Sequence, residues 1–260
     1  MTDMIKIAYC NVENLDLNKA YPLVSAKRKE KIDFYRFDKD KRLSCGAYLL
    51  AEKMLAEEGI VNPNFETHKF GKTYISNYEN IYFNISHSKN MVSCAVSDAE
   101  IGCDIEFNDP QIDLNIAKNY FFNSEYENIK RSKNPSNEFF KYWVLKESYM
   151  KYCGLGFRLE LSDFEIVIDS EIRLKNDIHN IKFNLFDVGR YKLATAGHFK
   201  TKEVNEYSLE DLYWFYIFFR LTCSPVIIWF ILWINLTVGP MKSAPRIVPI
   251  PTLPKFPRNT

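Results

Sequence analysis

The sequence has few of the residues that hold transition metals or form disulfide bonds. It contains four histidines among 260 residues. Its six cysteines lie far apart and include no C-x-x-C pair: Cys10, Cys45, Cys94, Cys103, Cys153 and Cys223. A zinc site depends on closely spaced ligands, and a disulfide framework is typical of short secreted chains. We therefore expect neither, and we expect the thiols to be reduced.

The first residues show no secretory signal pattern, and the chain has no excess of charge. Its first residues, M-T-D-M-I-K, do not place an apolar segment after a basic one, so we expect a cytoplasmic protein. The 34 Lys and Arg residues nearly balance the 33 Asp and Glu residues, which gives a formal net charge of +1. Apolar residues make up 47% of the chain, too large a share for a disordered protein.

Acidic residues are missing from residues 213–260, which contain five basic ones. The first 212 residues carry 29 basic against 33 acidic residues, a net charge of −4, and so offer no broad basic field for a nucleic acid. Leu221–Val238 is an uncharged run of 18 residues, near the lower limit for a membrane span, and a proline-rich end follows it. We predict an atypical tail over 213–260. Three interpretations stay open: a read-through extension, a membrane anchor and an additional core element.

The order of the expected elements indicates an α+β fold. Ser25 is a candidate helix cap, and a helical pattern runs from there to about Glu58. The turn 86–90 joins two of the expected strands. Strands are expected at 4–10, 81–85, 91–96, 101–107, 164–168, 181–186 and 191–196, and further helices at 112–120 and 137–152.

The segment I-G-C-D-I-E-F at 101–107 places two carboxylates on one face of a strand. Successive side chains on a strand point to opposite faces, so Gly102, Asp104 and Glu106 share a face. Like charges this close repel each other unless a proton or a cation lies between them, and oxygen ligands favour magnesium over zinc. The segment is therefore either a magnesium site or a solvated strand face.

The segment W-V-L-K-E-S-Y-M-K at 143–151 places Glu147 and Lys151 four residues apart on one face of a helix. Trp143 lies one turn earlier on that face. Such a Glu–Lys pair commonly decorates an exposed helix, so a surface pair and a functional pair are both open.

Ser86 and His87 are adjacent but do not indicate a hydrolase. The chain has no G-x-S-x-G motif, and neighbouring residues on a strand point apart. A turn that is rich in hydroxyl groups and contains one histidine suits phosphate binding. An ordinary hairpin turn is the alternative.

Taken in order, these segments resemble the surfactin-type 4′-phosphopantetheinyl transferases. The shared motifs are I-S-H-S at 85–88, G-x-D-x-E at 102–106 and W-x-x-K-E-S-x-x-K at 143–151. Upstream, the basic run 27–31 and Phe70-Gly71-Lys72 also match, although Thr73 stands where the family usually has proline. The resemblance extends from about Ser25 to Leu212.

The resemblance implies a two-lobed α+β pseudo-dimer within one monomeric chain, with residues 1–101 and 102–212 as the lobes. It implies an enzyme that binds coenzyme A between the lobes. The enzyme would transfer the 4′-phosphopantetheine group to a serine of an acyl or peptidyl carrier protein and release 3′,5′-ADP.

The resemblance also assigns roles to individual residues. Asp104, Glu106 and Glu147 would hold Mg²⁺ at the pyrophosphate, and Lys151 would neutralise the departing phosphate. Glu147 is also a candidate base for the carrier serine, but a metal-bound carboxylate is a poor base, so we favour the ligand role. The contacts to coenzyme A would come from Arg28, Lys31, Arg42, Lys72, Ser86 and His87.

Two other functions use the same residues. A metal-dependent nuclease could combine D-x-E with E-x-x-x-K, but the acidic body argues against it. A catalytically inactive carrier-binding protein would not need all three carboxylates and Lys151.

Overall fold

The computed structural model describes residues 4–222 of the chain. Met1–Tyr216 forms one compact unit, which contains two main sheets. The first sheet has the strand order β11 (Asn205–Glu206), β1 (Ile5–Asn11), β5 (Met91–Ser97) and β4 (Tyr82–Ser88). The second has the order β6 (Ile101–Phe107), β10 (Tyr191–Gly197) and β9 (Lys182–Val188). All pairs in both sheets are antiparallel except β1 with β11.

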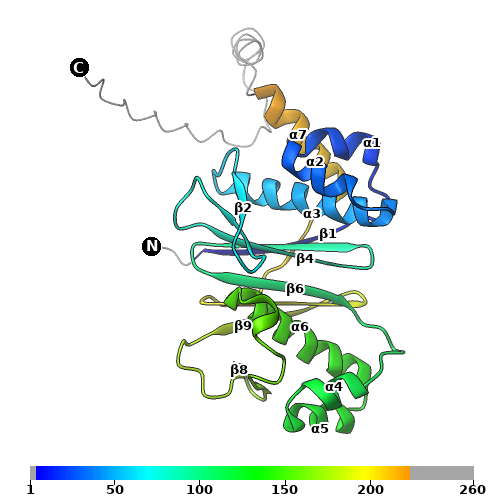
Figure 1. The fold of residues 1–260 in the computed structure, drawn as a ribbon, viewed down its shortest axis with the longest axis vertical. Helices are drawn as coiled ribbons and strands as arrows, with labels where there is room; N and C mark the ends of the chain where they lie inside the picture. The colour runs from blue at the N-terminus through cyan, green and yellow to red at the C-terminus, as the bar shows by residue number, and fades with distance from the viewer. Residues whose placement is uncertain (1–3, 223–260) are drawn as a thin grey trace, which may run out of the picture. The chain divides into compact units, whose positions relative to one another are not determined.

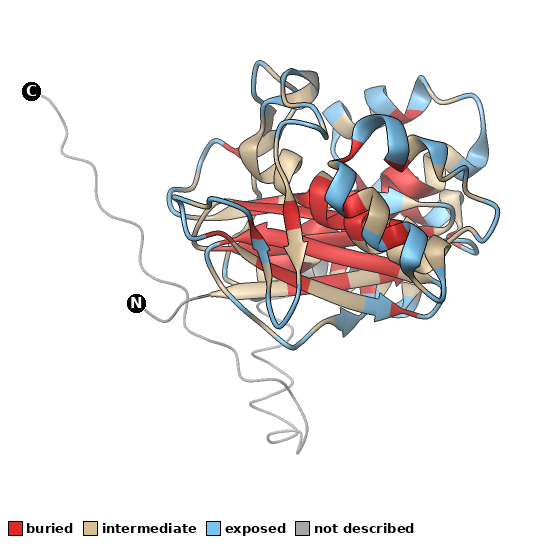
Figure 2. Ribbon diagram, turned by 90° about the horizontal axis from the view of Figure 1, so that it is seen from below, coloured by how far each residue is buried: buried red, intermediate tan, exposed pale blue. Residues whose placement is uncertain are grey.

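The two sheets and two long helices form four layers (Figure 1). The helix α3 (Asp38–Glu57) packs on the first sheet, and α6 (Pro135–Cys153) packs on the second. The inner faces of the sheets meet through small and branched side chains such as Ile7, Ala95 and Ile105. Buried residues are concentrated in the strands and on the helix faces that cover them (Figure 2). The mixed α/β architecture that we predicted is confirmed.

The predicted helix from Ser25 to Glu58 is two helices. Ser25 caps α2 (Ala26–Asp33) by accepting a hydrogen bond from the backbone N–H of Arg28, as its position suggested. The chain then leaves the helix and re-enters it at α3, where Phe37 has an extended backbone. The sequence pattern between Asp33 and Asp38 does not reveal the break between the helices. Phe34 and Phe37 are 90% and 62% exposed, so this stretch has no buried face that would hold it in a helix.

The segment Ser86-His87-Ser88 belongs to strand β4 and not to a turn, which corrects the prediction of a turn over 86–90. The turn between β4 and β5 consists of Lys89 and Asn90, and Lys89 has a positive φ of 53°. The polar sequence hid the strand because the partners of these hydroxyl groups lie on β6, outside the local sequence.

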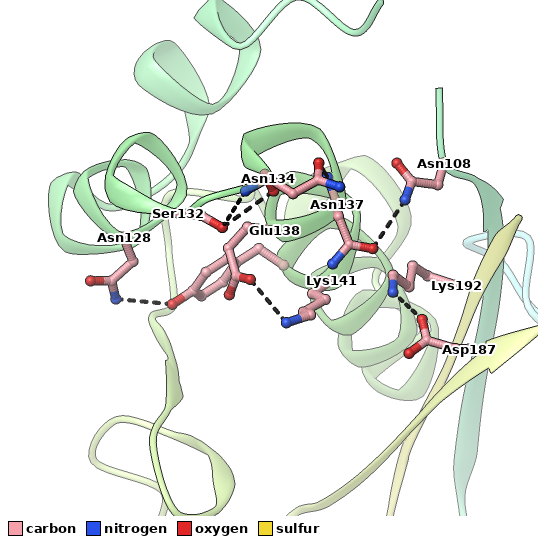
Figure 3. A network of polar contacts seen from close by, with 10 residues as sticks. Asn108, Asn128, Ser132, Asn134, Asn137, Glu138, Lys141, Asp187 and Lys192 are labelled. Carbon is pink, nitrogen blue, oxygen red and sulfur yellow. Dashed lines mark hydrogen bonds and ion pairs between the residues drawn. The ribbon is translucent and has the colours of Figure 1, made fainter. Parts of the chain in front are cut away.

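The helix α6 lies close to strand β6. A β-carbon at Gly102 would overlap the backbone of Ser148 and Tyr152 on α6, so only glycine allows this approach. At the other end of β6, the amide of Asn108 donates to Asn137 on α6 over 3.1 Å (Figure 3). The strand and the helix are therefore fixed to each other at both ends.

Shorter elements complete the described chain. One of them is α5 (Asn123–Arg131), which, like most of these short elements, was not predicted. The others are α1 (Leu17–Ala20), η1 (Tyr21–Leu23), β2 (Phe65–Thr67), β3 (Thr73–Ile75), α4 (Asn115–Tyr120), η2 (Gly156–Arg158), β7 (Ile166–Ile168), β8 (Ile172–Leu174) and α7 (Leu209–Thr222).

The compact unit ends at Tyr216, whereas we predicted its end at Leu212. The helix α7 crosses that boundary, and both Leu212 and Tyr216 are buried in the same core cluster as residues of α3 and β1. The hydroxyl of Tyr213 accepts a hydrogen bond from the backbone N–H of Asp16 over 3.0 Å.

Within residues 4–222, no helix is long and apolar enough to span a membrane. The proline-rich end and most of the predicted apolar run lie outside the described residues. The five cysteines in the described range form no disulfide bond with one another.

Candidate active site

A cavity of about 600 Å³ opens between the elements of the two sheets. It gathers predicted site residues that are far apart in the sequence. They come from α2 (Arg28, Lys31), the turn before β3 (Lys72), β4 (Ser86, His87), β6 (Asp104, Glu106) and α6 (Glu147, Lys151). Arg42 is not among the residues that line this cavity.

Strand β6 presents its two carboxylates to the cavity, as the two-residue period predicted. Ile101, Cys103 and Ile105 point into the apolar layer between the sheets, where each is at most 1% exposed. Asp104 and Glu106 occupy the opposite face and line the cavity.

Strand β4 supports β6 through side chains. Ser86 donates from its hydroxyl to Asp104 Oδ1 over 2.8 Å, and Ser88 donates to Glu106 Oε2 over 2.6 Å. Asn84 accepts the backbone N–H of Cys103 over 2.9 Å. These polar residues of β4 are spaced two apart: Ser86 and Ser88 hold the two carboxylates of β6, and Asn84 holds its backbone. The sequence analysis did not single out Asn84 or Ser88, although their alternation with Ser86 was visible in the sequence.

Lys151 reaches across the cavity from α6 to the same carboxylate. Its ammonium donates to Asp104 Oδ1 over 2.7 Å and to Ser86 Oγ over 2.8 Å. Burial acts to lower the pKa of Lys151, but the charge of Asp104 outweighs it and the pKa is raised. The other oxygen, Asp104 Oδ2, is buried and finds no hydrogen-bond partner within residues 4–222. Such an atom is costly to bury unless a ligand satisfies it.

The remaining carboxylates hold their protons more tightly than usual. Desolvation and the nearby charge of Asp104 raise the pKa of Glu106 to about 7. The same two causes raise the pKa of Glu147. Two carboxylates whose pKa values are raised beside the charge of a third form a site that favours a proton or a cation.

The residues of the motif W-x-x-K-E-S-x-x-K lie on two sides of α6, one facing the cavity and the other facing the core. Trp143, Glu147 and Lys151 line the cavity. Lys146 instead points into the core, where it is fully buried against Glu125 over 2.9 Å. The Glu147 and Lys151 pair is thus part of a cavity wall and not a surface decoration.

Cations line the opposite part of the cavity. The Arg28 guanidinium lies 5.1 Å above the ring of Tyr48 and donates to Ser44 Oγ over 3.4 Å. Desolvation lowers the pKa of Lys31, and the charge of Arg28 lowers it further. Desolvation followed by the charge of Lys151 lowers the pKa of His87, which keeps its ring neutral at pH 7. Two cations that repel each other form a site for an anion such as phosphate.

Within residues 4–222, no group of three or more His, Cys, Asp or Glu side chains gathers closely enough to hold a metal ion. The donor set nevertheless fits magnesium in its chemistry. It consists of carboxylate oxygens, one of which is buried without a partner among the described residues. The ammonium of Lys151 lies beside Asp104, where a cation is favoured.

Comparison with known proteins identifies the family. The model of the 4′-phosphopantetheinyl transferase superfamily matches residues 100–203. A 4′-phosphopantetheinyl transferase of Bacillus subtilis is 34% identical over 162 residues, which cover 60% of this chain and 69% of that protein. The 4′-phosphopantetheinyl transferase gsp of Aneurinibacillus migulanus is 33% identical, with coverage of 63% and 71%. Sfp of Bacillus subtilis (strain 168) is 30% identical, with coverage of 66% and 81%.

The fold, the cavity lined by carboxylates and lysines, and these matches together define a 4′-phosphopantetheinyl transferase. The chain belongs to the surfactin-type 4′-phosphopantetheinyl transferase family.

Proposed function

We propose that the protein transfers the 4′-phosphopantetheine group of coenzyme A to a serine of an acyl or peptidyl carrier protein, with Mg²⁺, and releases 3′,5′-ADP. The observation that carries the proposal is the meeting of Asp104, Glu106, Glu147 and Lys151 in one cavity whose other wall carries Arg28 and Lys31. An anionic wall and a cationic wall suit a metal-bound pyrophosphate ligand.

In this proposal the carboxylates of Asp104, Glu106 and Glu147 would hold Mg²⁺. The ion, when bound, would neutralise charge on the pyrophosphate. The carrier serine oxygen attacks the phosphorus that bears pantetheine, the bond to the bridging oxygen breaks, and the serine proton leaves. Glu147 is also a candidate to accept that proton, directly or through water, but a metal-bound carboxylate is a poor base and we favour its ligand role. Lys151 would face the departing phosphate.

The nucleotide end of coenzyme A would contact Arg28, Lys31, Ser86 and His87. All four line the same cavity as the carboxylates. Arg42 stays a prediction from the family pattern, as do a monomeric state and a cytoplasmic location. We also propose that residues 1–101 and 102–212 are two related lobes, because each contributes strands of one antiparallel sheet and a long helix that covers it.

Mass spectrometry of an apo carrier protein tests this function. After incubation with the protein, coenzyme A and Mg²⁺, we expect the carrier to gain the mass of one phosphopantetheine group, and chelation of the metal should prevent the gain. The absence of the gain for both an acyl and a peptidyl carrier would refute the proposal.

Removal of a metal carboxylate tests the site. We expect Asp104→Ala and Glu106→Ala each to lower transfer by at least ~10²-fold, the scale of losing one electrostatic contact in a phosphoryl-transfer site. Glu138→Ala is the matched control on α6, because Glu138 pairs with Lys141 outside the cavity. Turnover as high in Glu106→Ala as in Glu138→Ala would refute the metal assignment.

A further inference from the structure

Lys72 lies at the rim of the cavity, in the turn between β2 and β3, but its ammonium is engaged by the protein. It donates to Glu100 Oε2 over 2.5 Å, to the carbonyl of Ile101 over 3.1 Å and to the carbonyl of Tyr152 over 3.0 Å. The side chain is 11% exposed.

These three bonds use the full donor capacity of the side chain. A lysine ammonium has three protons and no acceptor atom. With one proton on each of three acceptors, Lys72 has none left for a phosphate oxygen. The family pattern placed Lys72 among the contacts to coenzyme A, so the structure gives this lysine a different role.

Two of the three acceptors of Lys72, the carbonyls of Ile101 and Tyr152, belong to the two elements that carry the catalytic groups. Tyr152 lies in the last turn of α6, where carbonyl groups lack partners within the helix and a cation is favoured. Lys151 directly precedes it. Ile101 begins β6, which carries Asp104 three residues later.

The turn that follows α6 is shaped around Lys72. Gly154 caps the helix in the left-handed region, with φ of 65°, and its N–H donates to the carbonyl of Met150 over 3.0 Å. A β-carbon on Gly154 would lie 3.1 Å from Lys72 Cδ, so glycine leaves space for the stem of the lysine.

We infer that Lys72 is a positioning residue that fixes the last turn of α6 against the start of β6 and so holds Lys151 at Asp104. It is not a ligand of a coenzyme A phosphate. The identity of the ligand in this inference rests on the proposed function, whereas the positioning contacts do not.

Hydrogen exchange of the ligand-free protein tests the positioning contacts. In Lys72→Met, we expect the amides of residues 150–156 to exchange at least about tenfold faster than in wild type, because the last turn loses its cation and its carbonyl partner. Lys69→Met is the matched control, since Lys69 is an exposed lysine of the same turn that lies over the ring of Phe70. Equal exchange in the Lys72 and Lys69 variants would overturn the inference.

Binding and turnover then separate a positioning role from a ligand role. For Lys72→Met, we expect the Kd of coenzyme A, measured by titration calorimetry, to rise by less than ~3-fold while kcat falls ~10- to 100-fold, since small displacements of catalytic groups are costly. A direct phosphate contact would instead raise the Kd by about tenfold or more with its charge-assisted bond lost. That second outcome would overturn the inference.

Substitution of Glu100, the carboxylate that pairs with Lys72, is expected to have an intermediate effect. Glu100→Gln leaves the two carbonyl contacts of Lys72 in place, so we expect kcat between those of wild type and Lys72→Met. A kcat as low as that of Lys72→Met would contradict the role of the carbonyl contacts. Wild-type protein that binds no coenzyme A would refute the proposed function alone, because the hydrogen-exchange result would still decide the positioning role.

Discussion

Two lysines of α6, five positions apart, make ion pairs in regions that differ in exposure and in hydrogen bonding. Lys146 is 0% exposed and pairs with Glu125, which is 1% exposed, on the core side of the helix. Lys151 is 29% exposed and pairs with Asp104, which is 4% exposed, on the cavity side. The two pairs have similar separations, 2.9 Å and 2.7 Å.

The pairs differ in how completely their polar atoms are satisfied. Lys146 also donates to the carbonyls of Leu161 and Phe164, and Glu125 accepts the N–H groups of Phe122 and Ile166. In the cavity, Asp104 Oδ2 has no partner within residues 4–222. A buried ion pair with every atom satisfied maintains the fold, whereas an incompletely satisfied pair leaves atoms for a ligand.

The largest effect on stability is expected from breaking the satisfied pair. Lys146→Met leaves the carboxylate of Glu125 buried without its counter-charge, so we expect the free energy of unfolding to fall by ~3–5 kcal/mol. Denaturant titration followed by circular dichroism measures the change. Lys141→Met is the control on the same helix, because Lys141 pairs with Glu138 nearer the surface (Figure 3) and should cost no more than about 1 kcal/mol.

A double variant separates the charge from the packing. Glu125→Gln combined with Lys146→Met removes the unpaired charge and keeps an acceptor for the two backbone N–H groups. We expect it to be more stable than Lys146→Met alone. A double variant less stable than either single variant would show that the pair contributes more than compensation of its own burial.

A smaller effect, of ~1–3 kcal/mol, is expected from the pH dependence of the cavity carboxylates. The folded-state pKa of Glu106 is about 7, above its ordinary value of 4.5, so the folded state binds this proton more tightly. The stability that Glu106 contributes is therefore fully present below about pH 4.5 and is lost as the pH rises through about 7.

The comparison of wild type with Glu106→Gln isolates this contribution. With the metal chelated, the free energy of unfolding of the wild type should fall relative to that of Glu106→Gln between pH 5 and pH 8. Parallel pH profiles for the two proteins would contradict the raised pKa of Glu106.

The cavity side of this comparison could be predicted from the sequence because its patterns are local. The two-residue period of a strand placed Asp104 and Glu106 on one face, and the four-residue spacing on a helix placed Glu147 and Lys151 together. The family motif then indicated that these faces meet. Neither the period nor the spacing depends on distant parts of the chain.

The core side could not be predicted in this way. In the sequence, Lys146 is indistinguishable from an exposed polar residue of a helix. Its partners, Glu125 of α5 and the carbonyls of Leu161 and Phe164, are brought to it only by tertiary packing. The role of Lys72 depends on Tyr152, 80 positions away. The break between α2 and α3 was missed because exposure, and not local sequence, distinguishes Phe34 and Phe37 from core residues.

The smallest effect is expected from Ser88, which supports the incompletely satisfied region from β4. Its hydroxyl donates to Glu106 Oε2 over 2.6 Å and accepts the N–H of Phe107 over 3.1 Å. Ser88→Ala should lower the free energy of unfolding by about 1 kcal/mol. Because the bond from Ser88 lowers the pKa of Glu106, its loss should also move the pH-dependent fall in stability to higher pH. Ser88→Thr retains the hydroxyl and should resemble the wild type. If the Ala and Thr variants have the same pH profile, the hydrogen bond from Ser88 does not set the charge of Glu106.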